Sequence, residues 1–375
     1  MKKVLLILFL LSTVIFGNDL KNLKSFYREE VTDRGYTIVK ARIVDIPYDD
    51  TKEKRDIPIE SDIRYQHVKV KLLTGDFKGK VYTLRNTIDQ INPYKLIFKK
   101  GEKILLYQYE ENGHLTGLKI FERSKENSLY FLVGIFILSM IAIGGIKGLK
   151  AFITLFLTVV VVIFFLVPLL VKGYSPIPIT IVAVGIITVI TLFIVSGINR
   201  KTLAGILGTV LGTIIAGVLA MGVSNYTQLV GMGSEDMQAL VYGSNGHFLD
   251  YRGILFSGVI IGALGAVMDV AISIASSMWE IEELNPEITN KQLIKSGMNI
   301  GKDIMGAMSN TLILAYVGSS LSLIMVFVSF KLSFCEIINL DIVATEIIRS
   351  IAGSIGLVLS IPVTVFVSVL LRDRK

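Results

Sequence analysis

The stretch GILFSGVIIGALGAVMDVAISIASSMWE occupies residues 253–280 and is apolar apart from one internal acid, Asp269. A helix of this length extends about 40 Å, which is more than the hydrocarbon core of about 30 Å that a membrane-spanning helix must cross. One sector of about 80° on a helical wheel holds only small or polar residues, namely Gly258, Gly262, Gly265, Asp269, Ser273, Ser276 and Glu280.

An acid at this depth needs a partner, water or a proton, and small residues let a neighbouring backbone approach closely. We therefore expect this face to point into protein or into a cavity. In one interpretation Asp269 lines a pathway for an ion, a proton or a solute. In the other, Gly258 and Gly262 form a packing seam and Asp269 is a structural acid. We favour the pathway, because ionisable groups inside membranes are costly and usually functional.

The composition also indicates a polytopic membrane protein. Hydrophobic residues make up 52% of the 375 and charged residues 18%, proportions that no ordinary soluble domain shows. The net charge of +7 raises the question of nucleic acid, but many of the basic residues stand in short loops beside apolar runs. Membrane topology explains that placement better, so nucleic acid is not an expected partner.

Cysteine and histidine give no metal-binding or disulfide pattern. The only cysteine is Cys335, and His67, His114 and His247 are scattered along the chain. We expect no disulfide, no metal site and no cofactor.

The N-terminal part predicts a signal sequence followed by a small β domain. Residues 1–17 have the form of a secretory signal peptide, with an uncleaved anchor as the alternative. Residues 18–127 are charged and alternate with a period of two. They predict five strands near 36–47, 64–73, 79–88, 102–110 and 114–122. Such a set favours a small extracytoplasmic barrel of OB-like or SH3-like type.

Residues 128–375 predict an α-helical transmembrane domain with about seven spans. We place them near 129–146, 151–171, 177–198, 202–223, 253–278, 304–330 and 343–371. Lys and Arg residues are concentrated in the loops that this order puts inside, so the positive-inside rule predicts an external β domain and a cytoplasmic C-terminus.

Three other spans carry candidate residues. Gly205, Gly208 and Gly212 share one face of the fourth span and predict close helix packing. In the sixth helix, Asp303 and Asn310 lie on one side, and Asn310 reaches a depth similar to that of Asp269.

In the last span, Glu346 and Arg349 are one turn apart near the external end. They form either an ion pair or an external gate, and we favour the ion pair.

The chain resembles the YibE/YibF-like bacterial membrane proteins. The likeness lies in HVKVKLLTGDFKGKVYTLRNTI and NPYKLIFKKGEKILLY of the β domain, in GALGAVMDVAISIASSMWE and in GKDIMGAMSNTLILAYVGSS. The resemblance implies a permease-like protein of the bacterial cell membrane with no established activity. It also implies the longer type with an external domain, whose partners would be the lipid bilayer and a shorter membrane-only homologue or a second copy.

Two functions are compatible with these features. The first is a transporter or transporter subunit in which Asp269 takes up a proton or cation and the neutral ligands come from Ser309 and Asn310, along a route that includes Ser273, Ser276 and Asp303. The alternative is an anchored interaction or assembly protein whose β domain binds a cell-envelope ligand. An intramembrane enzyme is not favoured, because the sequence has no HExxH or GxSxG motif.

Overall fold

The computed structural model describes residues 35–51, 53, 62–111, 113–233, 235–243 and 249–372. The predicted signal peptide and His247 lie outside the described residues. The chain divides into two compact units, and the boundary falls between Phe136 and Ile137, inside helix α3 (Glu126–Val161).

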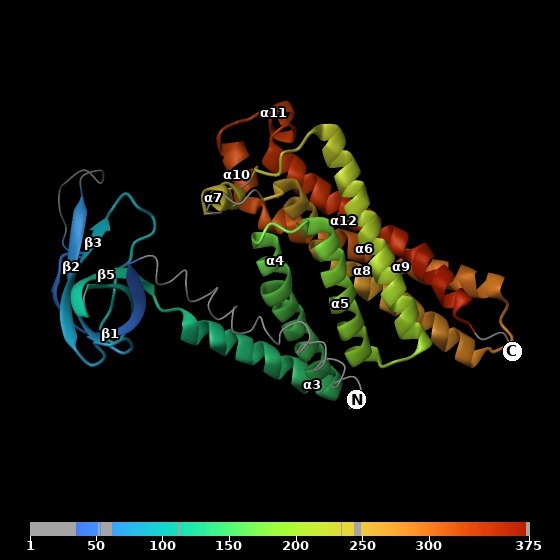
Figure 1. Cartoon of the computed structure of the whole chain (residues 1–375), viewed down its shortest axis with the longest axis horizontal. Coiled ribbons are helices and arrows are strands. Elements are labelled where there is room, and N and C mark those ends of the chain that lie inside the picture. The colour runs from blue at the N-terminus through green and yellow to red at the C-terminus, as the bar shows by residue number, and fades with distance from the viewer. Residues whose placement is uncertain are drawn as a thin grey trace. The chain divides into compact units, whose positions relative to one another are not determined.

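The first unit is a five-stranded antiparallel sheet that is nearly closed into a barrel (Figure 1). Its strands are β1 (Tyr36–Asp49), β2 (Ile63–Leu72), β3 (Val81–Asp89), β4 (Lys103–Glu111) and β5 (His114–Arg123). The order is β3-β2-β1-β4-β5, and the edge strands β3 and β5 approach each other. Because β1 pairs with both β2 and β4, the connections form the Greek key of an OB-like barrel.

The barrel core follows from the alternation that the sequence shows. Val39, Ala41 and Ile43 of β1 are buried, and Val68 and Val70 of β2 pack beside them. Because successive side chains in a strand point to opposite faces, the intervening lysines and arginines point outward. The predicted barrel-like fold and its five strands are confirmed.

The second unit is helical. Its helices are α3 (Glu126–Val161), which begins in the first unit, the π-helical turn η2 (Val162–Leu166), α4 (Val167–Val171), α5 (Pro176–Ser196), α6 (Arg200–Thr227), α7 (Glu235–Gly243), α8 (Tyr251–Leu284), α9 (Asn290–Ser319), α10 (Leu321–Ser329), α11 (Phe334–Ile338) and α12 (Asp341–Leu370).

Five helical segments of the described chain are long and apolar enough to cross a membrane. They are Glu126–Val171, Pro176–Ser196, Arg200–Thr227, Tyr251–Leu284 and Asp341–Leu370. A sixth span results if α9 and α10, which meet at a bend of 57°, are counted as one. The predicted membrane-embedded helical domain is confirmed, with five or six candidate spans where about seven were expected.

The difference in number arises at Gly145. The sequence predicts two spans, 129–146 and 151–171, whereas the structure has one helical segment that is broken at Gly145 (φ 54°, ψ −130°). A Cβ atom at Gly148 would overlap the carbonyl oxygen of Met140. Residues eight apart in a straight helix are separated by about 12 Å, so the chain turns back sharply here and the two arms match the two predicted spans.

The connection between α8 and α9 is shorter than expected. Residues 279–304 predict a cytoplasmic loop with a short interfacial helix, but α8 continues to Leu284 and α9 already begins at Asn290. Thr289 and Gln292 form a capping box, which pairs the free backbone N–H groups at the start of α9.

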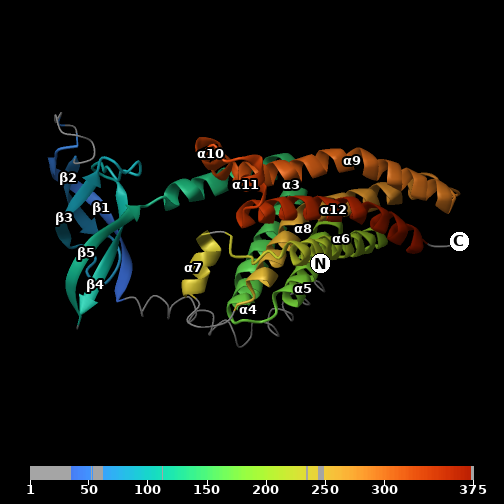
Figure 2. The ribbon, with the colours of Figure 1, turned by 90° about the horizontal axis from the view of Figure 1, so that it is seen from above.

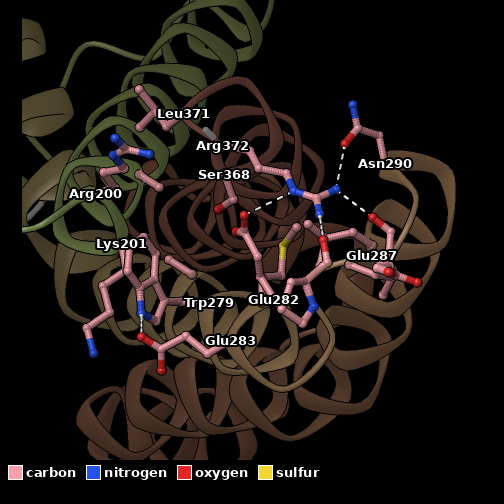
Figure 3. Close-up of a pocket in the computed structure, with 16 residues that line it drawn as sticks. Arg200, Lys201, Trp279, Glu282, Glu283, Glu287, Asn290, Ser368, Leu371 and Arg372 are labelled. Atoms are coloured by element: carbon pink, nitrogen blue, oxygen red, sulfur yellow. Dashed lines mark hydrogen bonds and ion pairs between the residues drawn. The ribbon is translucent and has the colours of Figure 1, made fainter. Parts of the chain in front are cut away.

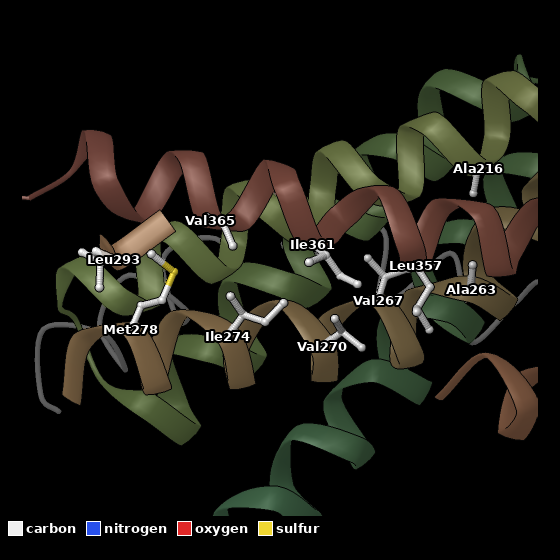
Figure 4. Close-up of a cluster of buried hydrophobic side chains, with 10 residues drawn as sticks. All are labelled: Ala216, Ala263, Val267, Val270, Ile274, Met278, Leu293, Leu357, Ile361 and Val365. Atoms are coloured by element: carbon white, nitrogen blue, oxygen red, sulfur yellow. The ribbon is translucent and has the colours of Figure 1, made fainter. Parts of the chain in front are cut away.

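The centre of the helical unit consists of α6, α8 and α12, which pack side by side (Figures 1 and 2). Val267, Val270 and Ile274 of α8 meet Leu357 and Ile361 of α12 in a buried apolar cluster (Figure 4). Helix α9 lies against α8 and α12, and α5 lies against α6 and α8. These contacts determine which face of α8 stays outside the bundle.

Candidate functional site

The polar face of α8 lies outside the helix bundle of this chain. Gly258, Gly262, Gly265, Asp269 and Ser273 are all exposed, whereas Val267, Ala271 and Ile274 on the opposite side have no exposed surface. The described helices pack on that opposite side and on the flanks. Within the described part of a single chain, protein therefore does not cover this face. That it points into protein or into a cavity stays a prediction.

Two side chains from neighbouring helices reach this face toward the N-terminal end of α8. Tyr316 of α9 places its hydroxyl group where a Cβ atom of Gly262 would lie, and Nη2 of Arg349 on α12 lies 3.8 Å from the equivalent point at Gly258. Nothing lies within 4 Å of that point at Gly265. Glycine thus makes room for Tyr316, and the face is open beyond it toward Asp269.

Glu346 and Arg349 form the ion pair that their spacing of three residues favours. Nη1 of Arg349 donates to Oε1 of Glu346 at 2.8 Å. Two further polar atoms of the pair, Oε2 of Glu346 and Nε of Arg349, are buried and hydrogen-bond to no described residue. The pair therefore keeps unused polar capacity beside Gly258.

Helix α9 brings Ser309 to the level of Asp269. The two helices are antiparallel, with Tyr316 opposite Gly262 and Gly301 opposite Ile274. Interpolation along the helix rise sets residues 307 and 308 opposite Asp269, so Ser309 lies within one helical turn of that level. The Oγ atom of Ser309 is buried without a hydrogen-bond partner among the described residues.

Asn310 does not come together with Asp269. Gly297 and Gly301 of α9 contact side chains of α8 and α12, and the helical phase places Asn310 and Asp303 on the opposite, exposed side. No hydrogen bond joins Asp269 to Asn310 in the described part of the chain, where Asp269 makes no ion pair either. The structure thus brings Tyr316, rather than Asn310, to the polar face of α8.

The glycines of α6 have a different role from those of α8. A Cβ atom at Gly212 would lie 2.6 Å from Cβ of Ser360, and one at Gly208 would overlap Oγ1 of Thr364. A Cβ atom at Gly205 would lie 3.2 Å from Cδ1 of Ile272 on α8. These three residues therefore form a close-packing seam against α8 and α12.

A pocket of about 570 Å³ lies at the other end of the bundle, where α6 begins and α8 and α12 end (Figure 3). Its most connected residue is Arg372. That side chain donates to Oε1 of Glu282 at 3.0 Å, to Oδ1 of Asn290 at 2.9 Å, and to the carbonyl oxygens of Pro286 and Ile288. No local sequence pattern predicts this role for Arg372, because its acceptors come from the end of α8, the start of α9 and the connection between them.

Metal-ligating side chains do not gather in the described residues, where no group of three or more His, Cys, Asp or Glu side chains is arranged to hold a metal ion. Cys335 is a free, exposed thiol.

Comparison with known proteins gives two family matches that together extend over most of the chain. The family model described as YibE/F-like protein matches residues 132–374. The model described as YibE/F family N-terminal domain matches residues 34–120. No curated protein and no solved structure matches the chain.

Proposed function

The chain belongs to the YibE/F-like family, and from this premise we propose that it is a membrane transporter, or a subunit of one, that moves an ion or a small solute. The route follows the polar face of α8. Asp269 takes up a proton or cation, and hydroxyl groups of Tyr316, Ser309 and Ser273 supply neutral ligands.

One observation carries this proposal: polar groups from three helices line a single face. Arg349 of α12 lies beside Gly258, Tyr316 of α9 lies against Gly262, and Asp269 follows on α8 itself. Eleven residues of helix separate Gly258 from Asp269, which corresponds to about 16 Å along the membrane normal for an upright helix.

The hydrogen-bonding state of these groups supports a route over a purely structural role. Buried polar atoms in proteins are normally hydrogen-bonded. Here Ser309 Oγ, Tyr316 OH, Glu346 Oε2 and Arg349 Nε are buried and have no partner among the described residues. Water or a passing solute would supply the partners that packing does not.

The exposure of Asp269 implies that a second protein surface completes the route. A carboxyl group that faces lipid inside the hydrocarbon core costs several kcal/mol, at least about 2.5 on insertion scales. We propose that a second copy of this chain covers the face, with a shorter membrane-only homologue as the alternative. The proposed location is the bacterial cell membrane, with the barrel outside and the C-terminus inside, as the loop charges predict.

Reconstitution tests the proposal directly. Purified full-length chain is placed in liposomes with an entrapped pH-sensitive dye, and a panel of monovalent and divalent cations is applied. Wild type should show flux that Asp269→Asn abolishes. Asp303→Asn is the matched control, because it makes the same chemical change on the outer side of α9. Equal flux in wild type and Asp269→Asn would reject the route.

A second candidate function is supported by the outer face of the barrel. Arg42 of β1 lies directly opposite Lys71 of β2 and Lys103 of β4. Like charges directly opposite each other are destabilising in a sheet. None of the three makes an ion pair with a described residue. Such a row suits an anionic cell-envelope ligand, which is the role expected of an anchored interaction protein.

Vesicle flotation separates the two candidates. Full-length chain in nanodiscs of neutral lipid is mixed with vesicles that contain phosphatidylglycerol. Arg42→Gln with Lys71→Gln should reduce co-flotation, whereas Lys78→Gln in an exposed turn should not. Flux that survives loss of vesicle binding would identify transport as the separate activity of the helices.

A further inference from the structure

The pocket at the end of α6, α8 and α12 is separate from the polar face of α8. Of its α8 residues, Ala275, Met278 and Glu282 lie on the side that faces α6 and α12. Glu283 is on the same side of the helix as Asp269 but lies about 21 Å further along its axis. A ligand in this pocket would therefore lie away from the proposed transport route.

Part of the charge in the pocket is already neutralised within the protein. Arg372 is paired with Glu282, and its other N–H groups donate to Asn290 and to two backbone carbonyl oxygens. A guanidinium group with this many acceptors has little capacity left for a ligand. Its role is to hold the α8–α9 connection against the end of α12, which forms one wall of the pocket.

The other charged side chains of the pocket include two basic residues on one wall and Glu287 on the opposite wall, while Glu283 accepts a hydrogen bond from Trp279. Arg200 and Lys201 stand at the N-terminus of α6, and Lys201 makes no ion pair with a described residue. Glu287 belongs to the α8–α9 connection and is exposed. Figure 3 shows the two basic residues on one side of Arg372 and Glu287 on the other. The backbone N–H groups at the start of α6 add to the positive charge of the wall that Arg200 and Lys201 form.

The space between these walls suits an organic molecule better than a bare ion. Its volume of about 570 Å³ falls in the range of pockets that hold small organic ligands. Trp279 presents an indole ring to this space, and its Nε1 donates to Glu283 at 2.7 Å.

We propose that this pocket binds a small organic zwitterion. Its anionic group, a carboxylate or phosphate, pairs with Lys201 and Arg200, and its amine faces Glu287. Its apolar body lies against Trp279. Two sources present this chemistry, a free solute such as an amino acid or amino-phosphate and the headgroup of a zwitterionic phospholipid.

The chain contains a reporter for this site, because Trp279 is its only tryptophan. Full-length chain in a non-ionic detergent is titrated with phosphoethanolamine, and Trp279 emission is followed. Inorganic phosphate and ethanolamine are titrated separately at the same ionic strength. We expect a saturable change with the zwitterion and binding about tenfold weaker, or weaker still, with either half.

Variants and a second probe complete the test. Lys201→Gln and Glu287→Gln should each weaken binding about tenfold, whereas Lys302→Gln, exposed on α9 outside the pocket, should leave it unchanged. Dihexanoyl phosphatidylethanolamine separates the sources: a response to this lipid but not to phosphoethanolamine assigns the headgroup.

Three results would overturn the proposal. In the first, Trp279 emission changes with neither phosphoethanolamine nor the lipid. In the second, inorganic phosphate or ethanolamine alone binds as tightly as phosphoethanolamine. In the third, Lys201→Gln and Glu287→Gln both bind phosphoethanolamine as tightly as wild type does. Size-exclusion elution of each variant, matched to wild type, shows that a loss of binding does not reflect misfolding.

Discussion

The hydroxyl group of Tyr316 on α9 occupies the place that a side chain at Gly262 on α8 would take. The contact joins two helices at the point where the polar face of α8 begins to open. It also explains why residue 262 has no side chain, since any Cβ atom there would displace the hydroxyl group.

Gly262→Ala should therefore destabilise the protein by about 1 kcal/mol, because overpacking at a close contact forces a neighbour to shift. Tyr316→Phe should relieve most of this loss. With the hydroxyl group removed, the nearest atom to the new methyl group is Cζ of the ring at 3.4 Å, an ordinary van der Waals distance. Thermal unfolding of the two single variants and the double variant in detergent measures this coupling. Strict additivity would show that the two positions do not touch.

Gly212→Ala should have a larger effect. Its new Cβ atom would lie 2.6 Å from Cβ of Ser360 and 3.2 Å from the carbonyl oxygen of Gly356, so the α6 and α12 backbones themselves must separate. We expect a loss of about 1–3 kcal/mol. Gly222→Ala in the same helix is the control, because nothing lies within 4 Å of its Cβ position. The thermal midpoint of each variant is measured from the size-exclusion peak that remains after heating to a series of temperatures. Equal midpoints for Gly212→Ala and Gly222→Ala would show that Gly212 is not in close contact with α12.

Glu122 gives the β domain an acid-sensitive contact. The hydroxyl group of Tyr94 donates to Oε2 of Glu122 at 2.5 Å, which lowers the pKa of that carboxyl group. A lowered folded-state pKa contributes stability that is complete above the ordinary pKa of 4.5 and is lost as the pH falls through the lowered value.

Glu122→Gln should therefore be less stable than wild type at pH 7, by about 1 kcal/mol or less because the contact is partly exposed. The difference should shrink below about pH 4. Chemical unfolding of the full chain at several pH values measures the difference in unfolding free energy between wild type and Glu122→Gln. A difference that grows as the pH falls would show that the contact with Tyr94 does not stabilise the ionised carboxylate.

Much of the barrel and of the α8 face is predictable from local pattern. Alternation along Val39, Ala41 and Ile43 places β1 correctly, because a strand has a period of two and one face must be buried. The alignment of Gly258, Gly262 and Asp269 follows from helix geometry alone.

What sequence could not give is the phase of one helix against another. Asn310 and Tyr316 of α9 both carry polar groups. The packing of Gly297 and Gly301 sets the rotation of α9, so that Tyr316 faces α8 and Asn310 faces away. The break at Gly145 is equally hidden, because the sequence holds many glycines inside helices and few of them adopt a positive φ. Long-range contacts determine both outcomes.

The exposed polar face of α8 predicts self-association of the chain. Copies in one membrane share an orientation, so a twofold axis along the membrane normal brings the same face of α8 together at the same depth. The open positions at Gly258 and Gly265 allow the close approach that such a contact needs. Ser273→Cys, made in a Cys335→Ser background, should then form a disulfide-linked dimer in membranes under mild oxidation.

Val182→Cys in the same background is the matched control, because Val182 is exposed on α5, which is a different side of the unit. The Val182→Cys variant should remain monomeric at the same protein density. Random collisions would cross-link both cysteine positions equally, whereas a specific contact through α8 links only position 273. Equal cross-linking at positions 182 and 273, or none at 273, would show that a second copy does not cover Asp269. The remaining candidate for that role would then be a different chain, such as a shorter membrane-only homologue, which co-purification would reveal.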